Sequence, residues 1–286
     1  MHKISNINLA RILMLMLAFL ISINGVLTKF LVDIFPQWEV IFFNSLTCFV
    51  VSLILILFKG KNNFKVNNIP KHFIRIFSMV FAFVIYVVSI KKIFIVEVMA
   101  IYNFAPVLSA VLAIIFLKEN FNFLRFVAFI LGFVGVLFVL QPGSGLFNVT
   151  LFLPVLGAFF VALAYVTTRS IMKIDNIYIT VFYYSLGLFI ISLFFFHINF
   201  IFPSLFFLLL LFLAGILSLV SHYLFALAVK YGQVNSVAPL EYSAFLWTGL
   251  LGYFVFNEIP NYIVILGGLI IILSGIYLIK IEKNLN

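Results

Sequence analysis

The sequence contains little charge. Asp, Glu, Lys and Arg make up 9% of its 286 residues, whereas a soluble domain carries about 25%. Hydrophobic residues make up 66%, and a chain of this length cannot hide them all around one aqueous core, because exposed surface still grows with size. The composition therefore argues against a soluble globular protein and indicates that lipid is the solvent.

Residues that carry enzyme chemistry are also scarce. The one cysteine, Cys48, lies in an apolar segment, where it allows no intrachain disulfide and belongs to no metal motif. No glycine-rich phosphate loop is present, which argues against direct drive by ATP. The four histidines stand far apart and form no catalytic cluster of the kind that an intramembrane enzyme needs: His2, His72, His197 and His222. We expect no enzyme activity, no metal and no cofactor.

The apolar residues are gathered into ten segments, each long enough to cross about 30 Å of hydrocarbon as a helix. Short stretches with Pro, Gly, Lys or Asn separate them. The sequence predicts an all-α integral membrane protein with ten transmembrane helices near residues 9–31, 39–58, 72–91, 95–117, 122–140, 149–168, 177–197, 204–229, 234–256 and 261–280.

The basic residues predict how these helices cross the membrane. With a cytoplasmic N-terminus, fourteen of the 17 Lys and Arg residues fall on the cytoplasmic side, several of them in the 59–71 linker. The 141–148 linker has none, and the other side receives only Lys29, Lys91 and Lys92. Cytoplasmic loops are enriched in Lys and Arg, so we expect both termini in the cytoplasm. Scattered in this way, the net charge of +9 does not indicate nucleic-acid binding.

The second half of the chain repeats the first. Shifted by about 140 positions, KFLVDIFPQWEVIFFNSLTCF from Lys29 falls on RSIMKIDNIYITVFYYSLGLF from Arg169. Identical residues meet at several positions, among them Phe42 and Phe182, Ser45 and Ser185, Leu46 and Leu186, Phe49 and Phe189. Because each unit has five helices, an odd number, the two units must lie in opposite orientations. Inverted repeats of this kind are typical of secondary transporters.

Each half ends with an apolar helix, a short turn containing a glutamate, and a glycine-bearing helix. These pieces read APVLSAVLAIIFLKENFNFLRFVAFILGFVGVLFVLQPG at 105–143 and VAPLEYSAFLWTGLLGYFVFNEIPNYIVILGGLIIILSGIYLI at 237–279. The chain thereby resembles the drug/metabolite transporter superfamily, in its ten-helix branch of paired EamA domains. The resemblance implies a first repeat over residues 8–143 and a second, inverted repeat over 148–281.

Shorter stretches are similar to the S-adenosylmethionine uptake carriers of that branch. They are WEVIFFNSL near residue 40, VFYYS at 181–185, APLEY at 238–242 and FVFNE at 254–258. Those carriers have an arginine in the second helix where this chain has Asn44. The resemblance therefore implies a site that lacks that cation.

Glu241 is the acidic residue that we expect in a transport site. It lies among apolar residues in the ninth predicted helix, where an ionised carboxylate should face a polar cavity or a partner. Such a residue serves as a counter-ion for a cationic or zwitterionic substrate or as a proton carrier; the alternative is an interfacial position. Its repeat mate is Tyr102, followed by Asn103 and by Pro106, which bends a helix and frees a carbonyl group.

Other polar residues complete the candidate site. The side-chain amides of Asn24 and Asn44 need a partner in lipid, so they should face protein or water. His222 lies beside Ser218, Ser221 and Tyr223, and we expect it to be neutral and hydrogen-bonded to their hydroxyls; the alternative is that it titrates during transport. The predicted substrate-binding residues are Asn24, Asn44, Tyr102, Asn103, Tyr184, His222, Glu241 and Trp247.

Four further charged residues lie near the ends of predicted helices. For the repeat mates Lys29 and Arg169, we expect side chains that extend to the membrane interface. Glu119 and Glu258 lie at turns, where we expect them to cap helices or to make gating contacts.

Three classes of function fit a multi-pass membrane protein. A channel would need rings of carbonyl groups or charges, and an intramembrane enzyme a catalytic cluster; the sequence offers neither. The inverted repeat and the sparse buried polar residues favour a secondary transporter that works by alternating access. We expect it to carry a cationic or zwitterionic metabolite, such as an amino acid or S-adenosylmethionine, with proton or exchange coupling. An exporter of drugs or other metabolites is the alternative.

Overall fold

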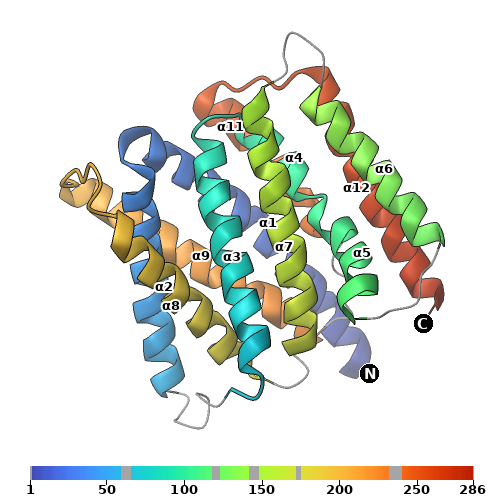
Figure 1. The fold of residues 1–286 in the computed structure, drawn as a ribbon, viewed down its shortest axis with the longest axis horizontal. Coiled ribbons are helices and arrows are strands. Elements are labelled where there is room, and N and C mark those ends of the chain that lie inside the picture. Colours follow the sequence, from blue (N-terminus) through green and yellow to red (C-terminus); the bar gives the residue numbers. More distant parts are fainter. Residues whose placement is uncertain are drawn as a thin grey trace.

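The chain folds as a bundle of helices. The computed structural model describes residues 2–58, 66–117, 123–141, 148–171, 175–231 and 240–285. Within these ranges the helices are joined by short turns and linkers, and there is no strand (Figure 1). The predicted all-α architecture is therefore confirmed.

The described helices follow the predicted segments closely. Eight spans are long and apolar enough to cross a membrane, with α4 and α5 counted as one, and α6 and α11 contain two shorter apolar stretches. The elements are α1 (His2–Ile34), α2 (Gln37–Phe58), α3 (Ile69–Ile90), α4 (Ile95–Tyr102), α5 (Ala105–Leu117), α6 (Phe123–Leu140), the short 3-10 helix η2 (Val149–Leu151), α7 (Phe152–Ile171), α8 (Ile177–Phe195), α9 (Leu205–Tyr231), α11 (Ser243–Phe256) and α12 (Tyr262–Leu285).

Local sequence determines where several helices begin and end. Pro36 separates α1 from α2, since a proline disfavours helical geometry in the residue before it. The side chains of Asn68 and Asn176 cap α3 and α8 by accepting backbone N–H groups at 3.2 Å. Asn257 ends α11 in the left-handed conformation, with φ 55°, which asparagine tolerates better than most residues.

The helix predicted over 95–117 is broken in the middle. A turn at Asn103 and Phe104 separates α4 from α5, just before Pro106, in agreement with the bend that this proline predicts. The second repeat has a matching turn at Tyr242, directly before α11. The first turn follows Tyr102 and the second follows its repeat mate Glu241, so the two helices are broken at equivalent positions.

The helices pack in pairs that follow the symmetry between the two repeats. Helix α1 packs on α9, and α3 packs on α7, which is the same contact with the repeats exchanged. The α2–α8 and α6–α12 pairs each map onto themselves. Helices α6 and α12 lie side by side and run in opposite directions (Figure 1), and the glycines Gly135 and Gly267 face each other's backbone where they cross.

Side-chain contacts between α2 and α8 show the inversion directly. Hydrogen bonds join Ser45 to Ser192 at 3.0 Å and Ser52 to Ser185 at 2.9 Å. A shift of 140 positions turns Ser45 into Ser185 and Ser52 into Ser192, so it converts one bond into the other. The repeat mates Phe49 and Phe189 stack on each other, with ring centroids 5.2 Å apart. A residue meets its own repeat mate in this way only near a two-fold axis.

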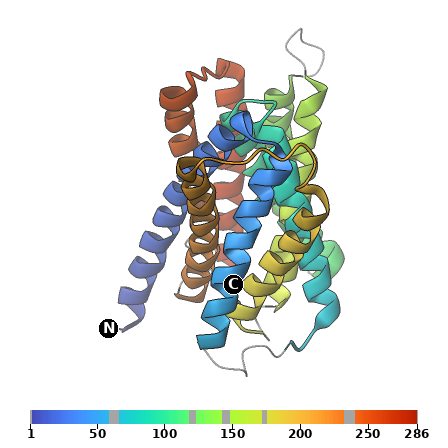
Figure 2. The ribbon, with the colours of Figure 1, turned by 90° about the vertical axis from the view of Figure 1, so that its left-hand side faces the viewer.

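Both chain termini lie at the same end of the bundle. The linker between α8 and α9 crosses the opposite end, above the start of α2 (Figure 2). There the carboxylate of Glu39 accepts the backbone N–H of Ile201 at 3.0 Å and holds this linker against the first turn of α2. Large apolar side chains such as Phe133, Leu209 and Leu273 are exposed on the outer surface, which suits contact with lipid.

Candidate functional site

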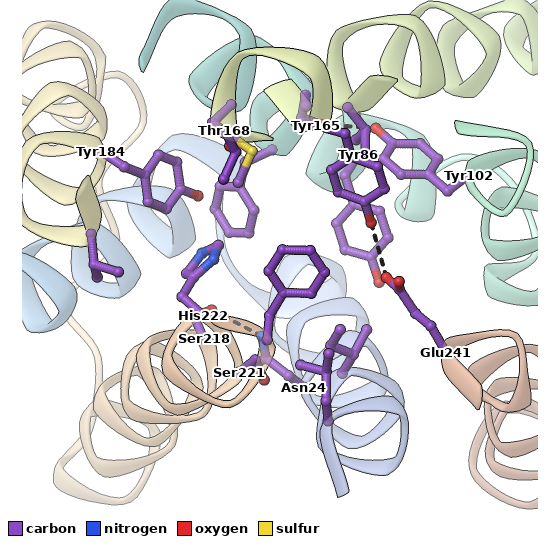
Figure 3. A pocket seen from close by; sticks show the side chains of 18 of the residues that line it. Asn24, Tyr86, Tyr102, Tyr165, Thr168, Tyr184, Ser218, Ser221, His222 and Glu241 are labelled. Atoms are coloured by element: carbon purple, nitrogen blue, oxygen red, sulfur yellow. Dashed lines mark hydrogen bonds between the residues drawn. The ribbon is translucent and has the colours of Figure 1, made fainter. Parts of the chain in front are cut away.

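A cavity of about 280 Å³ lies between the two repeats. Its walls come from α1, α3, α4 and the turn after it, α7, α8, α9 and the segment before α11, so each repeat supplies part of the wall. The lining is mostly apolar, with a few polar and charged side chains pointing inward (Figure 3). Mostly apolar pockets with a few converging polar groups are the usual form of small-molecule sites.

Six of the eight predicted site residues line this cavity, namely Asn24, Tyr102, Asn103, Tyr184, His222 and Glu241. The structure places the other two elsewhere. Asn44 is fully buried behind the cavity wall, where its amide donates to the hydroxyl of Ser218 at 2.9 Å. Trp247 is 40% exposed on the outer surface and packs edge-on against Phe19. Asn44 therefore acts on the cavity only through Ser218, and Trp247 does not reach it.

Glu241 points into the cavity from the segment before α11 (Figure 3). One carboxylate oxygen accepts a hydrogen bond from the hydroxyl of Tyr165, at 2.9 Å. Tyr165 lies on α7, within the same repeat, and its ring stacks on Phe225 of α9. The carboxylate is therefore oriented by a neutral donor and forms no salt bridge among the described residues.

Arg75 on α3 is the residue that the sequence analysis missed. It was assigned to the charges that orient the protein, yet it is 6% exposed and lines the cavity. Its guanidinium donates to the hydroxyl of Thr168 and to the carbonyl of Thr180, both at 2.8 Å. The chain thus has Asn44 where the resemblance places an arginine, but a different cation, Arg75, lines the cavity. A sequence signal exists, because Arg75 and Tyr86, eleven positions apart, lie on the same face of one helix.

The cavity also holds polar atoms that have no hydrogen-bond partner among the described residues. They are the side-chain oxygen of Asn24, the side-chain nitrogen of Asn103 and the hydroxyl of Tyr86. Buried polar groups are normally hydrogen-bonded, to protein or to water. Together these atoms offer an acceptor, a donor and a hydroxyl to a polar ligand.

His222 does not make the hydrogen bonds that its neighbours in the sequence suggested. Ser218 accepts from the amides of Asn24 and Asn44, and Ser221 donates to a backbone carbonyl of its own helix. The imidazole instead lies edge-on to Tyr184 of α8, with ring centroids 4.8 Å apart (Figure 3). None of the predicted bonds from His222 to a hydroxyl is present among the described residues, and the hydroxyl of Tyr223 has no hydrogen-bond partner there.

An ion pair joins the two repeats near the end of the bundle opposite the termini. Lys29 pairs with Glu258 and donates to the carbonyl of Ile93 at 3.0 Å. The expectation that Lys29 extends to the interface is therefore wrong, because Glu258 compensates its charge inside the protein. Glu258 also accepts the N–H of Ile95, the first residue of α4, at 2.9 Å, so the predicted capping role is confirmed. Glu119 and the Arg169 side chain lie outside the described residues.

A second pair joins the repeats near the end that carries the termini. His72 of α3 lies 2.9 Å from the carboxylate of Asp175, just before α8. The backbone N–H of Asn67 donates to the same carboxylate at 3.1 Å. Burial raises the pKa of Asp175, but the hydrogen bonds from His72 and Asn67 outweigh it, so the pKa lies below its usual value. The carboxylate therefore stays ionised at neutral pH.

Comparison with known proteins agrees with this architecture. A solved crystal structure shares the fold with a TM-score of 0.66 and 15% identity, and the match covers 99% of each chain. An S-adenosylmethionine uptake transporter of Rickettsia prowazekii is 29% identical over 92% of this chain and 90% of its own length. The one of Rickettsia bellii is 27% identical with the same coverage.

A riboflavin transporter of Vibrio cholerae is 24% identical over 63% of this chain and 61% of its own length. The decisive match is to a family rather than to one relative. Residues 8–141 and 148–281 each match the EamA-like transporter family, whose members are transporters and not enzymes. The match takes in both helix repeats and both walls of the cavity. This chain belongs to the EamA-like transporter family.

Proposed function

We propose that this protein is a secondary transporter that carries a small organic metabolite across the bacterial inner membrane by alternating access. The observation that carries the proposal is the cavity between two inverted repeats, bounded by the broken helices at Asn103 and Tyr242. Transporters built from inverted repeats tend to hold their substrates at such a place, next to interrupted helices. We take residues 8–143 and 148–281 as the two units that move relative to each other.

The substrate is cationic or zwitterionic and resembles S-adenosylmethionine or an amino acid. Glu241 supports this proposal, because a carboxylate in a mostly apolar cavity favours a ligand with a positive group. Aromatic rings from Tyr102 and Tyr184 line the same cavity from different sides and are suited to cation–π contacts. The Rickettsia relatives, which are named for S-adenosylmethionine uptake, support the same class of substrate.

Transport requires the two ends of the cavity to open in turn. We propose that Lys29 and Glu258 separate when the cavity opens away from the termini, and that His72 and Asp175 separate when it opens at the other end. Each pair joins one repeat to the other, so relative movement of the repeats must break one pair or the other. Packed interfaces tend to have such discrete arrangements rather than continuous ones.

Uptake by purified protein in liposomes tests the function. Radiolabelled S-adenosylmethionine should enter with a rate that saturates, and unlabelled substrate inside should accelerate the entry by exchange. Liposomes without protein give the background. Flux that rises in proportion to concentration without exchange would identify a channel, and the absence of any S-adenosylmethionine flux would remove this substrate from the proposal.

A further inference from the structure

Arg75 is a buried cation with unused hydrogen-bonding capacity. A guanidinium group carries five N–H donors in a fixed plane. The hydroxyl of Thr168 and the carbonyl of Thr180 accept two of them, and no described residue accepts the other three. Because Arg75 lines the cavity, these remaining donors are available to a molecule bound there.

The charge of Arg75 is also uncompensated. Both of its acceptors are neutral oxygens, and among the described residues it forms no salt bridge. A buried cation without an anionic partner is costly, whereas an anionic ligand group would satisfy both the charge and the donors. Guanidinium and carboxylate groups match each other as two parallel hydrogen bonds.

Glu241 is the complementary case in the same cavity. Its carboxylate has one neutral donor, Tyr165, and it forms no salt bridge with Arg75. The two charges come from different repeats but are anchored on one helix, because Tyr165 and Thr168 lie three residues apart on α7, about 4.5 Å along its axis. Because both residues line the same cavity, a molecule long enough to span it can contact both charges at once.

We propose that Arg75 binds the carboxylate of the transported molecule while Glu241 binds its positive group, so that the site selects a zwitterion and not a simple cation. This assignment rests on the proposed function, and makes Arg75 a residue that determines specificity. An inorganic cation or an amine satisfies Glu241 alone, and an organic anion satisfies Arg75 alone. A zwitterion is the ligand class that leaves neither charge unpaired and that ties the two repeats together.

Two ligands that differ only in the carboxylate test the proposal. Binding of S-adenosylmethionine and of its decarboxylated form to the purified protein is measured by titration calorimetry. The wild type should prefer the carboxylate-bearing ligand by about tenfold to a hundredfold, as expected for a charged hydrogen-bonded pair. Arg75→Gln should bring the two affinities together by weakening only the first, and Arg75→Lys should keep part of the preference.

Lys71→Gln is the matched control, because Lys71 lies one turn away on α3 and donates to Ser170 outside the cavity. That variant should keep the wild-type preference. Unchanged binding of the decarboxylated ligand shows that the Arg75→Gln protein is folded. If Arg75→Gln does not fold, Thr168→Val takes its place: it removes one anchor of the guanidinium and should reduce the preference for the carboxylate-bearing ligand.

A wild type without preference, or an Arg75→Gln protein that keeps the preference, overturns the assignment. Binding of neither ligand to the wild type would instead remove the proposed function and the assignment with it.

Discussion

Glu241 holds its carboxylate in a cavity, where among the described residues Tyr165 alone donates a hydrogen bond to it. Replacement by Gln removes the charge at nearly constant shape. We expect the affinity for a cationic or zwitterionic ligand to fall by about 1–3 kcal/mol, because a hydrogen bond to a charged group is replaced by a neutral one. Ligand titration of the purified Glu241→Gln protein gives this loss directly.

Glu39→Gln is the control for that measurement. Glu39 is also a buried glutamate, but it bonds to the backbone of Ile201 and does not line the cavity. Its replacement should leave ligand affinity within the error of the titration. Equal affinity in the wild type and in Glu241→Gln would return Glu241 to an interfacial role.

Removal of one partner of the Lys29–Glu258 pair should change the stability of the protein rather than its affinity for a ligand. Lys29→Met leaves the carboxylate of Glu258 buried without its cation, and Glu258→Gln leaves the ammonium group without its anion. Each single change should reduce the free energy of unfolding by about 3–5 kcal/mol, as is typical when one partner of a buried pair is removed. The double variant should recover much of this loss.

Thermal unfolding of the detergent-purified proteins gives the comparison. The coupling between the two sites is the quantity of interest, since it isolates the pair from the other contacts of each residue. Additive losses in the double variant would show that the two charges do not stabilise each other.

Sequence patterns predict residue positions along the helices better than side-chain surroundings. Glu241 stands out because it is the only acid in its apolar segment, and the structure places it in the cavity wall. Arg75 and Lys29 lie within about two turns of a helix end, where a basic residue usually reaches water. Their burial depends on partners from the other repeat or on a cavity. The spacing of Arg75 and Tyr86 indicates a shared face, but not that this face lines a cavity.

At the scale of the helices, α6 and α12 meet where two glycines face each other. A Cβ atom on Gly267 would lie 2.7 Å from the carbonyl oxygen of Gly135, a backbone atom that cannot move aside easily. Gly267→Ala should therefore destabilise the protein by about 1–3 kcal/mol, as overpacking usually does. Thermal unfolding in detergent measures the loss.

Gly249→Ala on α11 is the matched control for the glycine contact. A Cβ atom there would lie 3.5 Å from its nearest neighbour, a methyl group of Val96, which is ordinary contact. Because alanine favours a helix over glycine by up to about 1 kcal/mol, this variant should be neutral or more stable. Similar losses in both variants would show that the close approach of α6 and α12 is not what Gly267 provides.

The break between α4 and α5 was predictable because proline acts through the local backbone. Pro106 lacks an N–H group and its ring clashes with the preceding turn, so the bend follows from one residue. The face that each helix turns toward the cavity was not predictable in the same way. Helix α8 carries large apolar residues on all sides, since lipid and protein both accept them, and its pattern does not separate the two.

At the scale of the whole molecule, the internal repeat made the fold predictable from the sequence. The alignment of Ser45 with Ser185 and of Phe49 with Phe189 returns as contacts around the two-fold axis of the α2–α8 pair. Because the repeats are symmetric, a contact between two helices distant in sequence implies a second contact with the repeats exchanged. The charged lining of the cavity could not be inferred from symmetry, since Arg75 and Glu241 have no charged counterparts in the other repeat.

The two-fold relation also gives the orientation a direct test. Helix α2 ends and α3 begins at the end that carries the termini, whereas α6 ends and α7 begins at the other end (Figure 1). Cysteines are introduced singly at Asn63 and Ser144, in the corresponding linkers, after replacement of Cys48 by Ala. With fourteen of 17 basic residues predicted on the cytoplasmic side, a membrane-impermeant thiol reagent should label Ser144→Cys in intact cells and Asn63→Cys only after lysis. The reverse pattern would place the termini outside, and would exchange which of the two inter-repeat pairs, Lys29–Glu258 or His72–Asp175, faces the cytoplasm.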